Sequence, residues 1–273
     1  MKRDEWAVLV ERRVLSADAY LLFFEAPTLP STSSPGQFTM VRTPGEGLLL
    51  RRPYSICSVE PETQRFSLLV KVVGQGTGAL AELPLGGGVH CLGPLGTSFE
   101  RPPDGARAVV VAGGVGIAPF LYFCESLAKN GVMARVLLGG RQARDLYLKD
   151  EFVELGMEVV CSTEDGSDGH RGVVTDLLPG ALEGHQPVQL YSCGPSGMLR
   201  RVAEMAADRN VPHQVSIERR MGCGMGCCLG CVVFVSGSAK QDGNGEGDYH
   251  RACTEGPVFD ADRIDWDRDQ HPL

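Results

Sequence analysis

The C-terminal cysteines constrain the fold of this chain more than any other feature of its sequence. Cys223, Cys228, Cys231 and Cys253 follow the pattern C-x4-C-x2-C-x21-C, and C-x4-C-x2-C…C is the spacing of plant-type [2Fe–2S] sites. Interspersed glycines let the backbone come close to a di-iron core and direct N–H groups at its sulfur atoms. We therefore predict that these four cysteines bind a [2Fe–2S] cluster. Cys227 breaks the spacing and is predicted not to be a ligand.

A zinc knuckle is the alternative for the same residues. Zinc sites favour C-x2-C pairs, and only Cys228 and Cys231 form one, so the spacing favours the cluster. The remaining cysteines are spread through apolar segments, where a buried thiol is the ordinary interpretation. This distribution indicates metal binding in a reducing compartment rather than a disulfide framework. The scattered cysteines are Cys57, Cys91, Cys124, Cys161 and Cys193.

Length and charge exclude several classes of protein. The 273 residues, 43% of them hydrophobic, suffice for about two domains of roughly 100–150 residues each. The net charge of −8 makes nucleic acid and anionic membranes poor partners. The first residues contain no apolar signal core. The uncharged stretch Ala108–Cys124 is broken by glycines and Pro119, which predicts a strand, a turn and a helix instead of a membrane span. We expect a soluble, cytoplasmic protein.

The first hundred residues alternate short β-rich runs with turn signals. This pattern predicts a small antiparallel barrel in a domain of residues 1–101, with one helix at Thr77–Leu83. The predicted strands are Trp6–Val14, Tyr20–Glu25, Gln37–Arg42, Tyr54–Val59, Phe66–Val73 and Val89–Leu92.

From residue 102 the pattern changes. Ala108–Ala112 is a continuous apolar run, as in a parallel strand that is buried on both faces, and it predicts a doubly wound α/β domain over residues 102–217. Residues 218–273 are expected to form a small cysteine- and glycine-rich module, in which the polar segment Ser236–Arg251 is an exposed loop. Further strands are predicted at Ala134–Leu138, Glu158–Ser162 and Val188–Cys193, and helices at Pro119–Lys129, Leu146–Leu155, Val173–Leu178 and Gly197–Asp208.

Two short motifs in the barrel are suited to a nucleotide. Arg52-Pro53-Tyr54-Ser55 places a cation, an aromatic face and a hydroxyl along one strand, where they can hold a pyrophosphate and a planar ring. Gly76-Thr77 lies at the start of a helix, where backbone N–H groups favour phosphate. Taken alone, such motifs are more often a strand edge and an ordinary helix start.

Two motifs of the α/β domain follow parallel strands. Gly113-Gly114-Val115-Gly116 follows the first strand, where dinucleotide-binding domains place a phosphate loop, although it departs from G-x-G-x-x-G. Cys193-Gly194-Pro195 ends a later strand, at the edge of the sheet where ligands bind. The alternatives are a generic strand-to-helix turn and a buried cysteine followed by a turn.

The order of these motifs resembles the ferredoxin–NADP reductase superfamily. Arg52–Ser55 comes first, Gly113–Pro119 second and Cys193–Met198 third. With the segments Glu218–Cys231 and Cys253–Phe259 added, nearly the whole chain is similar to the electron-transfer subunits of dihydroorotate dehydrogenase B.

The resemblance implies FAD on the barrel, NAD(H) on the α/β domain and the [2Fe–2S] cluster on the four cysteines. It places Cys193 near the contact between nicotinamide and flavin. Tyr54 differs from the aliphatic residue often found in this family, and Cys227 replaces a small residue, but neither change removes a predicted ligand. The implied cofactor-binding residues are Arg52, Pro53, Tyr54, Ser55, Leu69, Val70, Lys71, Gly76 and Thr77 for FAD, and Gly113, Gly114, Gly116, Gly194 and Pro195 on the α/β domain.

The resemblance also implies a function in pyrimidine biosynthesis. Dihydroorotate would be oxidised at the FMN of a separate catalytic subunit, within a heterotetramer of two subunit types. Electrons would cross singly through the cluster to FAD, which reduces NAD+. This chain shows no constellation that demands a catalytic base, and a (β/α)8 barrel for the catalytic subunit would need about 250 residues.

Two alternatives remain at the level of sequence. The chain could be the reductase subunit of a ferredoxin:NADP oxidoreductase, a sulfide dehydrogenase or a hydrogenase. In the ferredoxin:NADP type an aspartate commonly occupies the first ligand position, which is Cys223 here. The chain could instead be a redox sensor, which would bind the cofactors without oxidising NADH.

Overall fold

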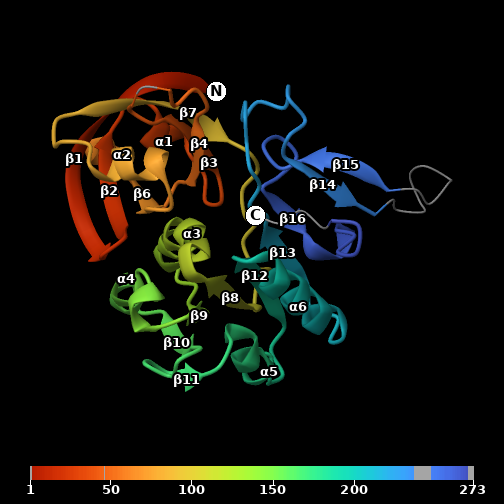
Figure 1. Ribbon diagram of the computed structural model, residues 1–273. Helices are drawn as coiled ribbons and strands as arrows, with labels where there is room; N and C mark the ends of the chain where they lie inside the picture. Colours follow the sequence, from red (N-terminus) through yellow and green to blue (C-terminus); the bar gives the residue numbers. More distant parts are fainter. Residues whose placement is uncertain (1, 46, 237–246, 270–273) are drawn as a thin grey trace.

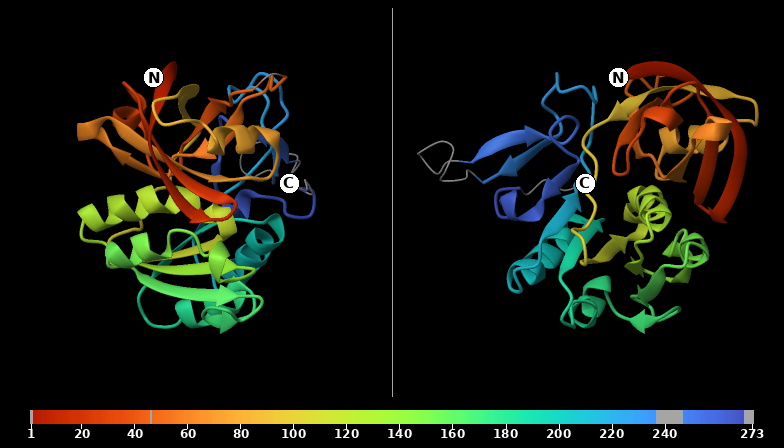
Figure 2. Two further views of the ribbon diagram at one scale, coloured as in Figure 1. Left: turned by 60° about the vertical axis from the view of Figure 1, so that its left-hand side comes forward. Right: turned by 180° about the vertical axis from the view of Figure 1, so that it is seen from behind.

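The computed structural model describes residues 2–45, 47–236 and 247–269, which form three parts in chain order. An N-terminal antiparallel sheet is followed by an α/β domain and by a C-terminal module (Figure 1). The module lies beside the sheet and against the α/β domain, as the two turned views in Figure 2 also show.

The N-terminal part is a strongly curled sheet of seven antiparallel strands in the order β4-β3-β7-β1-β2-β6-β5. Alternate residues of β2 and β6 face its interior, where Leu22 and Phe24 pack with Phe66 and Leu68. The strands are β1 Arg3–Ser16, β2 Ala19–Glu25, β3 Phe38–Arg42, β4 Arg52–Ser55, β5 Ser58–Glu60, β6 Arg65–Lys71 and β7 Gly88–Leu95, with helices α1 Leu29–Thr32 and α2 Gln75–Ala81 and the 3-10 turn η1 Pro61–Thr63.

The prediction of one strand over Tyr54–Val59 was wrong. The chain forms two strands there, β4 and β5, which lie at opposite edges of the sheet. Ile56 and Cys57 between them are fully buried. The N–H of Ile56 donates to the carbonyl of Gln37 and that of Cys57 to the carbonyl of Ser67, so this corner connects the two edges of the sheet. The corner gives the curled sheet its barrel-like closure.

The α/β domain confirms the doubly wound prediction. Its sheet has the order β11-β10-β9-β8-β12-β13-β16, and all its pairs are parallel except β13 with β16. No helix in the described ranges is long and apolar enough to cross a membrane. The elements are β8 Arg107–Gly113, η2 Gly114–Ile117, α3 Ala118–Lys129, β9 Ala134–Gly140, η3 Ala143–Asp145, α4 Lys149–Glu154, β10 Glu158–Thr163, β11 His170–Arg171, η4 Val174–Leu177, α5 Leu178–Ala181, β12 Val188–Cys193, α6 Ser196–Ala207 and β13 His213–Ser216.

The helix predicted at Leu146–Leu155 is shorter than expected, because α4 begins only at Lys149. Leu148 has a φ of 60°, which a helix interior does not allow. The side chains of Leu146, Tyr147 and Leu148 are all buried, so burial of this apolar segment overrides its helical pattern.

The C-terminal module contains a two-stranded sheet of β14 Val232–Val235 and β15 Asp248–Arg251, followed by β16 Val258–Asp260 and η5 Ala261–Arg263. β16 joins the edge of the α/β sheet beside β13. The prediction that Ser236–Arg251 is one exposed loop was wrong at its end, since residues 248–251 form β15 and pair with β14. The part of this segment at 237–246 lies outside the described residues.

Four aromatic rings pack where the sheet of the N-terminal part meets the α/β domain. The ring centroid of Phe99 lies 5.1 Å from those of Phe120 and Phe123 and 5.8 Å from that of Tyr191. Phe99 precedes the first strand of the α/β domain and is 7% exposed. Its side chain therefore ties the connecting segment to the core of the α/β domain.

We expect Phe99→Ala to lower the free energy of unfolding by about 3–5 kcal/mol, because it leaves a cavity among three other rings. Urea denaturation followed by circular dichroism measures the change. Met133→Ala is the control, since Met133 is 49% exposed and its loss should change stability by only about 0.5 kcal/mol. Equal effects of the two substitutions would contradict the assigned role of Phe99.

Candidate functional site

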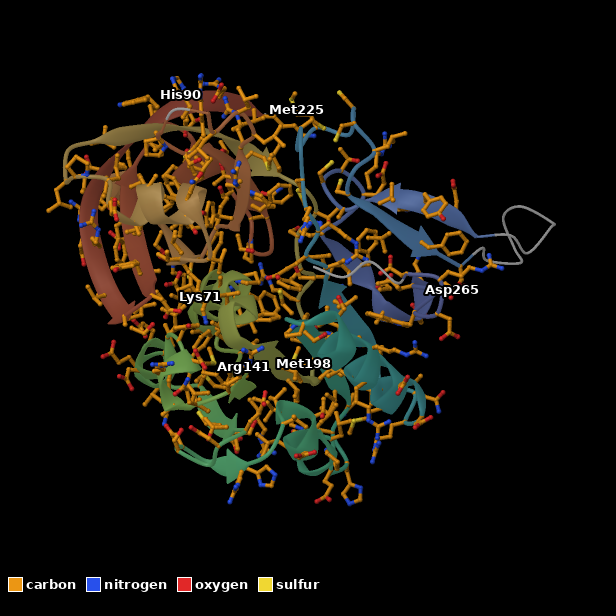
Figure 3. All side chains as sticks on the ribbon, in the orientation of Figure 1. Lys71, His90, Arg141, Met198, Met225 and Asp265 are labelled. Atoms are coloured by element: carbon orange, nitrogen blue, oxygen red, sulfur yellow. The ribbon has the colours of Figure 1, made fainter. Side chains whose placement is uncertain are left out.

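A cavity of about 700 Å³ lies where the N-terminal sheet, the α/β domain and the C-terminal module meet. Pockets that bind cofactors usually measure about 300–1,000 Å³. Figure 3 shows Lys71, from the end of β6, on the side of the N-terminal sheet that faces the α/β domain. The cavity is lined by Phe38, Gly47, Leu48, Leu49, Leu50, Arg51, Arg52, Pro53, Tyr54, Ser55, Leu69, Lys71, Val73, Val115, Ala118, Ser216, Ile217, Glu218, Arg219, Arg220, Met221 and Pro257.

Strand β4 contributes all four residues of the predicted flavin motif to this cavity. The Tyr54 hydroxyl is buried and has no hydrogen-bond partner among the described residues. Burial raises its pKa to about 12, against a smaller opposing effect of the Arg52 charge. A buried hydroxyl without a partner is costly, and a polar ligand group in the cavity would satisfy it. The residues of β4 therefore fit a ligand that is both planar and anionic.

Arg52 also contacts the start of helix α2. A β-carbon added at Gly76 would lie 3.3 Å from Nε of Arg52, so glycine leaves the room that the guanidinium occupies. The Thr77 hydroxyl accepts hydrogen bonds from the N–H groups of Val73 and Gly74, at 2.9 and 3.1 Å. Thr77 thus shapes the turn before α2, and neither Gly76 nor Thr77 is among the residues that line the cavity.

Strand β6 divides its three predicted residues between two faces. Leu69 and Lys71 line the cavity, whereas the side chain of Val70 is fully buried in the interior of the N-terminal sheet. Successive side chains of a strand point to opposite faces, so Val70 faces the interior of the sheet while its two neighbours face the cavity. Lys71 also lies 3.5 Å from Asp145, between its Nζ and Oδ1, and so crosses to the α/β domain.

The two glycine turns of the α/β domain pack against each other. They follow β8 and β12, which are neighbouring parallel strands, so both lie at the carboxyl edge of the sheet. A β-carbon at Gly116 would lie 2.7 Å from Cα of Gly194, and one at Gly113 would lie 2.9 Å from Cδ of Pro195. Glycine is needed at both positions for this close approach. The neighbouring Val115 and Ala118 line the cavity.

Cys193 is buried behind the cavity wall, and its contact with the cavity runs through Glu218. The Cys193 thiol lies 3.9 Å from Oε1 of Glu218, and Glu218 lines the cavity. Burial raises the pKa of both groups. Sequence reasoning quoted Glu218 only as part of the C-terminal motif and assigned it no role. Glu218 lies two residues after the end of β13, at the ligand-binding edge of the sheet, and its position shows as a signal only once that strand is known.

The segment that leaves β13 was also missed as a cavity wall. Ser216–Met221 line the cavity, and Arg219 within it forms a buried ion pair with Asp269 and donates to the carbonyl of Val232 at 3.2 Å. These contacts fasten the cavity wall to the C-terminal module. β13 itself was not predicted, because four residues after Pro212 are too few for a clear pattern.

The four predicted cluster cysteines form two pairs. The Cys228 side chain affects the pKa of Cys223, and the Cys231 side chain affects that of Cys253, so the two members of each pair lie near each other. The second pair is buried, whereas Cys228 is exposed. Two thiolates on each of two irons is the arrangement of a [2Fe–2S] cluster, so two adjacent pairs fit it.

A single metal ion would need a different arrangement. Within residues 2–45, 47–236 and 247–269, no three His, Cys, Asp or Glu side chains are grouped so that they could hold one metal ion. The choice between a two-iron cluster and a zinc knuckle therefore rests on the spacing of the cysteines.

Backbone N–H groups point at the cysteine sulfur atoms. The N–H of Met225 donates to Sγ of Cys223 at 3.4 Å, and those of Cys228 and Cys227 add to it. These bonds hold the pKa of Cys223 at about 6, well below the usual value of a thiol. Cys227 contributes its backbone to this arrangement while its own side chain is exposed. The loop is thus preorganised to receive thiolate rather than thiol.

Comparison with known protein families divides the chain as the structure does. Residues 6–99 match the oxidoreductase FAD-binding domain, and residues 110–204 match the oxidoreductase NAD-binding domain. Residues 218–265 match the iron-sulfur cluster binding domain of dihydroorotate dehydrogenase B. These matches confirm the predicted cofactors FAD, NAD(H) and an iron–sulfur cluster, and with them an oxidoreductase.

Individual relatives agree over nearly the full length. The dihydroorotate dehydrogenase B (NAD(+)) electron transfer subunit of Desulforamulus reducens is 38% identical over 93% of this chain and 95% of the relative. The subunit of the same name from Bacillus caldolyticus is 36% identical over 95% and 98%. A solved structure of an NADH-dependent reduced ferredoxin-NADP oxidoreductase superposes with a TM-score of 0.83 at 30% identity, over 96% of this chain and 91% of that one. The chain therefore belongs to the family of dihydroorotate dehydrogenase B electron-transfer subunits.

Proposed function

We propose that this chain connects the oxidation of dihydroorotate, at the FMN of a catalytic partner subunit, with the reduction of NAD+. One observation carries the proposal: the cavity wall ends at Met221, and the first cysteine of the cluster site is Cys223. Two residues of extended chain span at most about 7 Å. The flavin-type cavity and the paired cysteines are therefore neighbours, as electron transfer between them requires.

FAD, when bound, exchanges a pair of electrons with NAD(H) and single electrons with an iron–sulfur cluster. The chain's own residues bind the cofactor and orient it. Arg52 holds a phosphate, the Tyr54 and Ser55 hydroxyls donate to polar atoms of the ligand, and Leu69 covers its apolar face. These roles rest on the cavity lining and on the unpartnered hydroxyl of Tyr54.

On the α/β side of the cavity, the packed glycine turns at residues 113–116 and 194–195 lie at the carboxyl edge of the sheet, where domains of this kind bind a dinucleotide. Cys193 and Glu218 form the buried polar pair beside these turns. Burial raises the pKa of Glu218 and so favours the uncharged form of this carboxyl group.

In the C-terminal module, Cys223, Cys228, Cys231 and Cys253 would hold the two irons of the cluster through their thiolates. The mutual proximity of these side chains supports the ligand set. The partner docks on the side of the exposed Cys228, where Met225 and Leu229 are also exposed. The assembly is a heterotetramer of two subunit types in the cytoplasm.

The proposal predicts which activity the chain has alone and which activity needs the partner subunit. The purified chain, loaded with its cofactors, should reduce ferricyanide with NADH and should not oxidise dihydroorotate, whose FMN site belongs to the partner. Addition of the catalytic subunit should create dihydroorotate:NAD+ activity, measured as NADH absorbance. A chain that oxidises dihydroorotate by itself would refute the two-subunit proposal. If NADH oxidation by the chain were coupled to ferredoxin instead of dihydroorotate, the result would favour the alternative function, that of a ferredoxin-NADP oxidoreductase subunit like the solved structure that this chain resembles.

The ligand assignment predicts different results for neighbouring cysteines. Cys228→Ser should lose most of the iron and acid-labile sulfide, because it removes a thiolate from one observed pair. Cys227→Ser is the matched control and should keep both, since its side chain is exposed and belongs to neither pair. Iron and sulfide analysis with visible absorption measures the outcome. Equal losses in the two variants would show that the ligands are misassigned.

The role of Arg52 predicts a change in flavin affinity. Arg52→Ala should weaken FAD binding by about 1.5–3 kcal/mol, roughly 10- to 150-fold in Kd, through loss of a charge-assisted phosphate contact. Titration of the flavin-free chain with FAD measures Kd. Arg65→Ala is the control, because Arg65 also lies in the N-terminal sheet but pairs with Glu25 away from the cavity. An unchanged Kd in Arg52→Ala would exclude the phosphate contact.

A further inference from the structure

Arg251, the last residue of β15, is held in place by Glu255. Its backbone N–H and its Nε both donate to Oε2 of Glu255, at 2.7 and 3.0 Å, and its second guanidinium nitrogen pairs with Oε1. The Thr254 hydroxyl donates to the same carboxylate at 2.8 Å. A bidentate pair of this kind fixes the plane of the guanidinium.

The remaining guanidinium nitrogen reaches the loop of the paired cysteines. It donates to the carbonyl of Gly226 at 3.3 Å. The N–H of Gly226, which belongs to the preceding peptide group, lies near Cys253 and lowers the pKa of that thiol against the larger opposing effect of burial. A β-carbon at Gly226 would lie 3.1 Å from Cγ2 of Thr254, and the φ of Gly226 is 86°, so the backbone at Gly226 is enclosed in one conformation. Arg251 and Cys253 therefore contact the same residue from opposite sides.

Arg251 is also close to the buried cysteine pair. It pairs with Val232, the neighbour of Cys231, and the N–H of the next residue, Ala252, donates to the carbonyl of Cys231 at 2.9 Å. Arg251 and Glu255 have 37% and 31% of their side chains exposed. Exposed pairs of this kind add little to global stability, so the effect of this one is expected to be local.

We propose that Arg251 is a positioning residue that raises the reduction potential of the cluster, by holding Gly226 so that its N–H faces Cys253 and by placing a fixed positive charge beside Cys231 and Cys253. The inference rests on the proposed ligand set. Reduction adds one negative charge to a group that already carries four thiolates. Hydrogen bonds to sulfur and a nearby cation stabilise this added charge, which makes the one-electron reduction more favourable.

Substitution of Arg251 in the full, cofactor-loaded chain tests the inference. Arg251→Gln removes the charge, and Arg251→Lys keeps it but lacks the planar fork that bonds Glu255 and Gly226 together. Arg268→Gln is the matched control, because Arg268 is an exposed arginine of the same module that lies over Phe234 and pairs with Asp265. The midpoint potential is measured by redox titration followed by electron paramagnetic resonance.

We expect Arg251→Gln to shift the equilibrium between reduced and oxidised cluster about tenfold toward the oxidised form, which corresponds to a midpoint potential lower by about 59 mV. Arg251→Lys should shift it less, and Arg268→Gln should leave it unchanged. The resonance spectrum should change in both Arg251 variants as the backbone at Gly226 shifts. If Arg251→Gln does not assemble a cluster, Arg251→Lys tests the inference instead. A midpoint potential lower than that of the unsubstituted chain supports the role of Arg251, and an unchanged potential overturns it.

Two outcomes separate this inference from the proposed function. A full complement of iron and sulfide with an unchanged potential in both Arg251 variants would overturn the role of Arg251 alone. Absence of acid-labile sulfide from the unsubstituted chain would overturn the ligand set itself. Iron and sulfide are therefore determined before the titration.

Discussion

One apolar core shared by all three parts of the chain supports the rest of the structure. Met40 of the N-terminal sheet, Val215 and Ile217 of the α/β domain, and Cys231 and Cys253 of the C-terminal module belong to the same buried cluster. Apolar burial of this kind is the main stabilising contribution in folded proteins. Because the core spans all three parts, it sets the position of the cysteine pairs relative to the cavity.

Around this core, backbone groups and buried charges prepare each site for its ligand. N–H groups lower the pKa of the Cys223 thiol, whereas burial raises that of Glu218 beside the cavity. The buried ion pair of Arg219 and Asp269 holds the connecting segment against the module. Breaking such a pair would leave a buried charge uncompensated, so this segment has little freedom to move. The rigid link suits electron transfer, since its rate depends on fixed short distances.

Local patterns predicted well wherever one physical requirement dominated. The strand Ala108–Ala112 was recognisable because a strand buried on both faces must be apolar throughout, and β8 Arg107–Gly113 contains it. Prediction failed where distant contacts override local preference. β4 and β5 looked like one strand because the pattern does not reveal the corner at Ile56 and Cys57, which forms only against Gln37 and Ser67. β16 was missed because three residues form a strand only when β13 is beside them.

The sequence by itself determined the kinds of site: the cysteine spacing specified a two-iron cluster, and the motif order specified a flavin and a nicotinamide domain. Covalent spacing and glycine content are local properties, so they can be read from the chain. Only the tertiary structure decided which residues share each site. It moved Val70 out of the cavity, brought Glu218 into it and placed Arg251 beside Gly226. These are contacts between distant segments, and their geometry exists only after the shared core has formed.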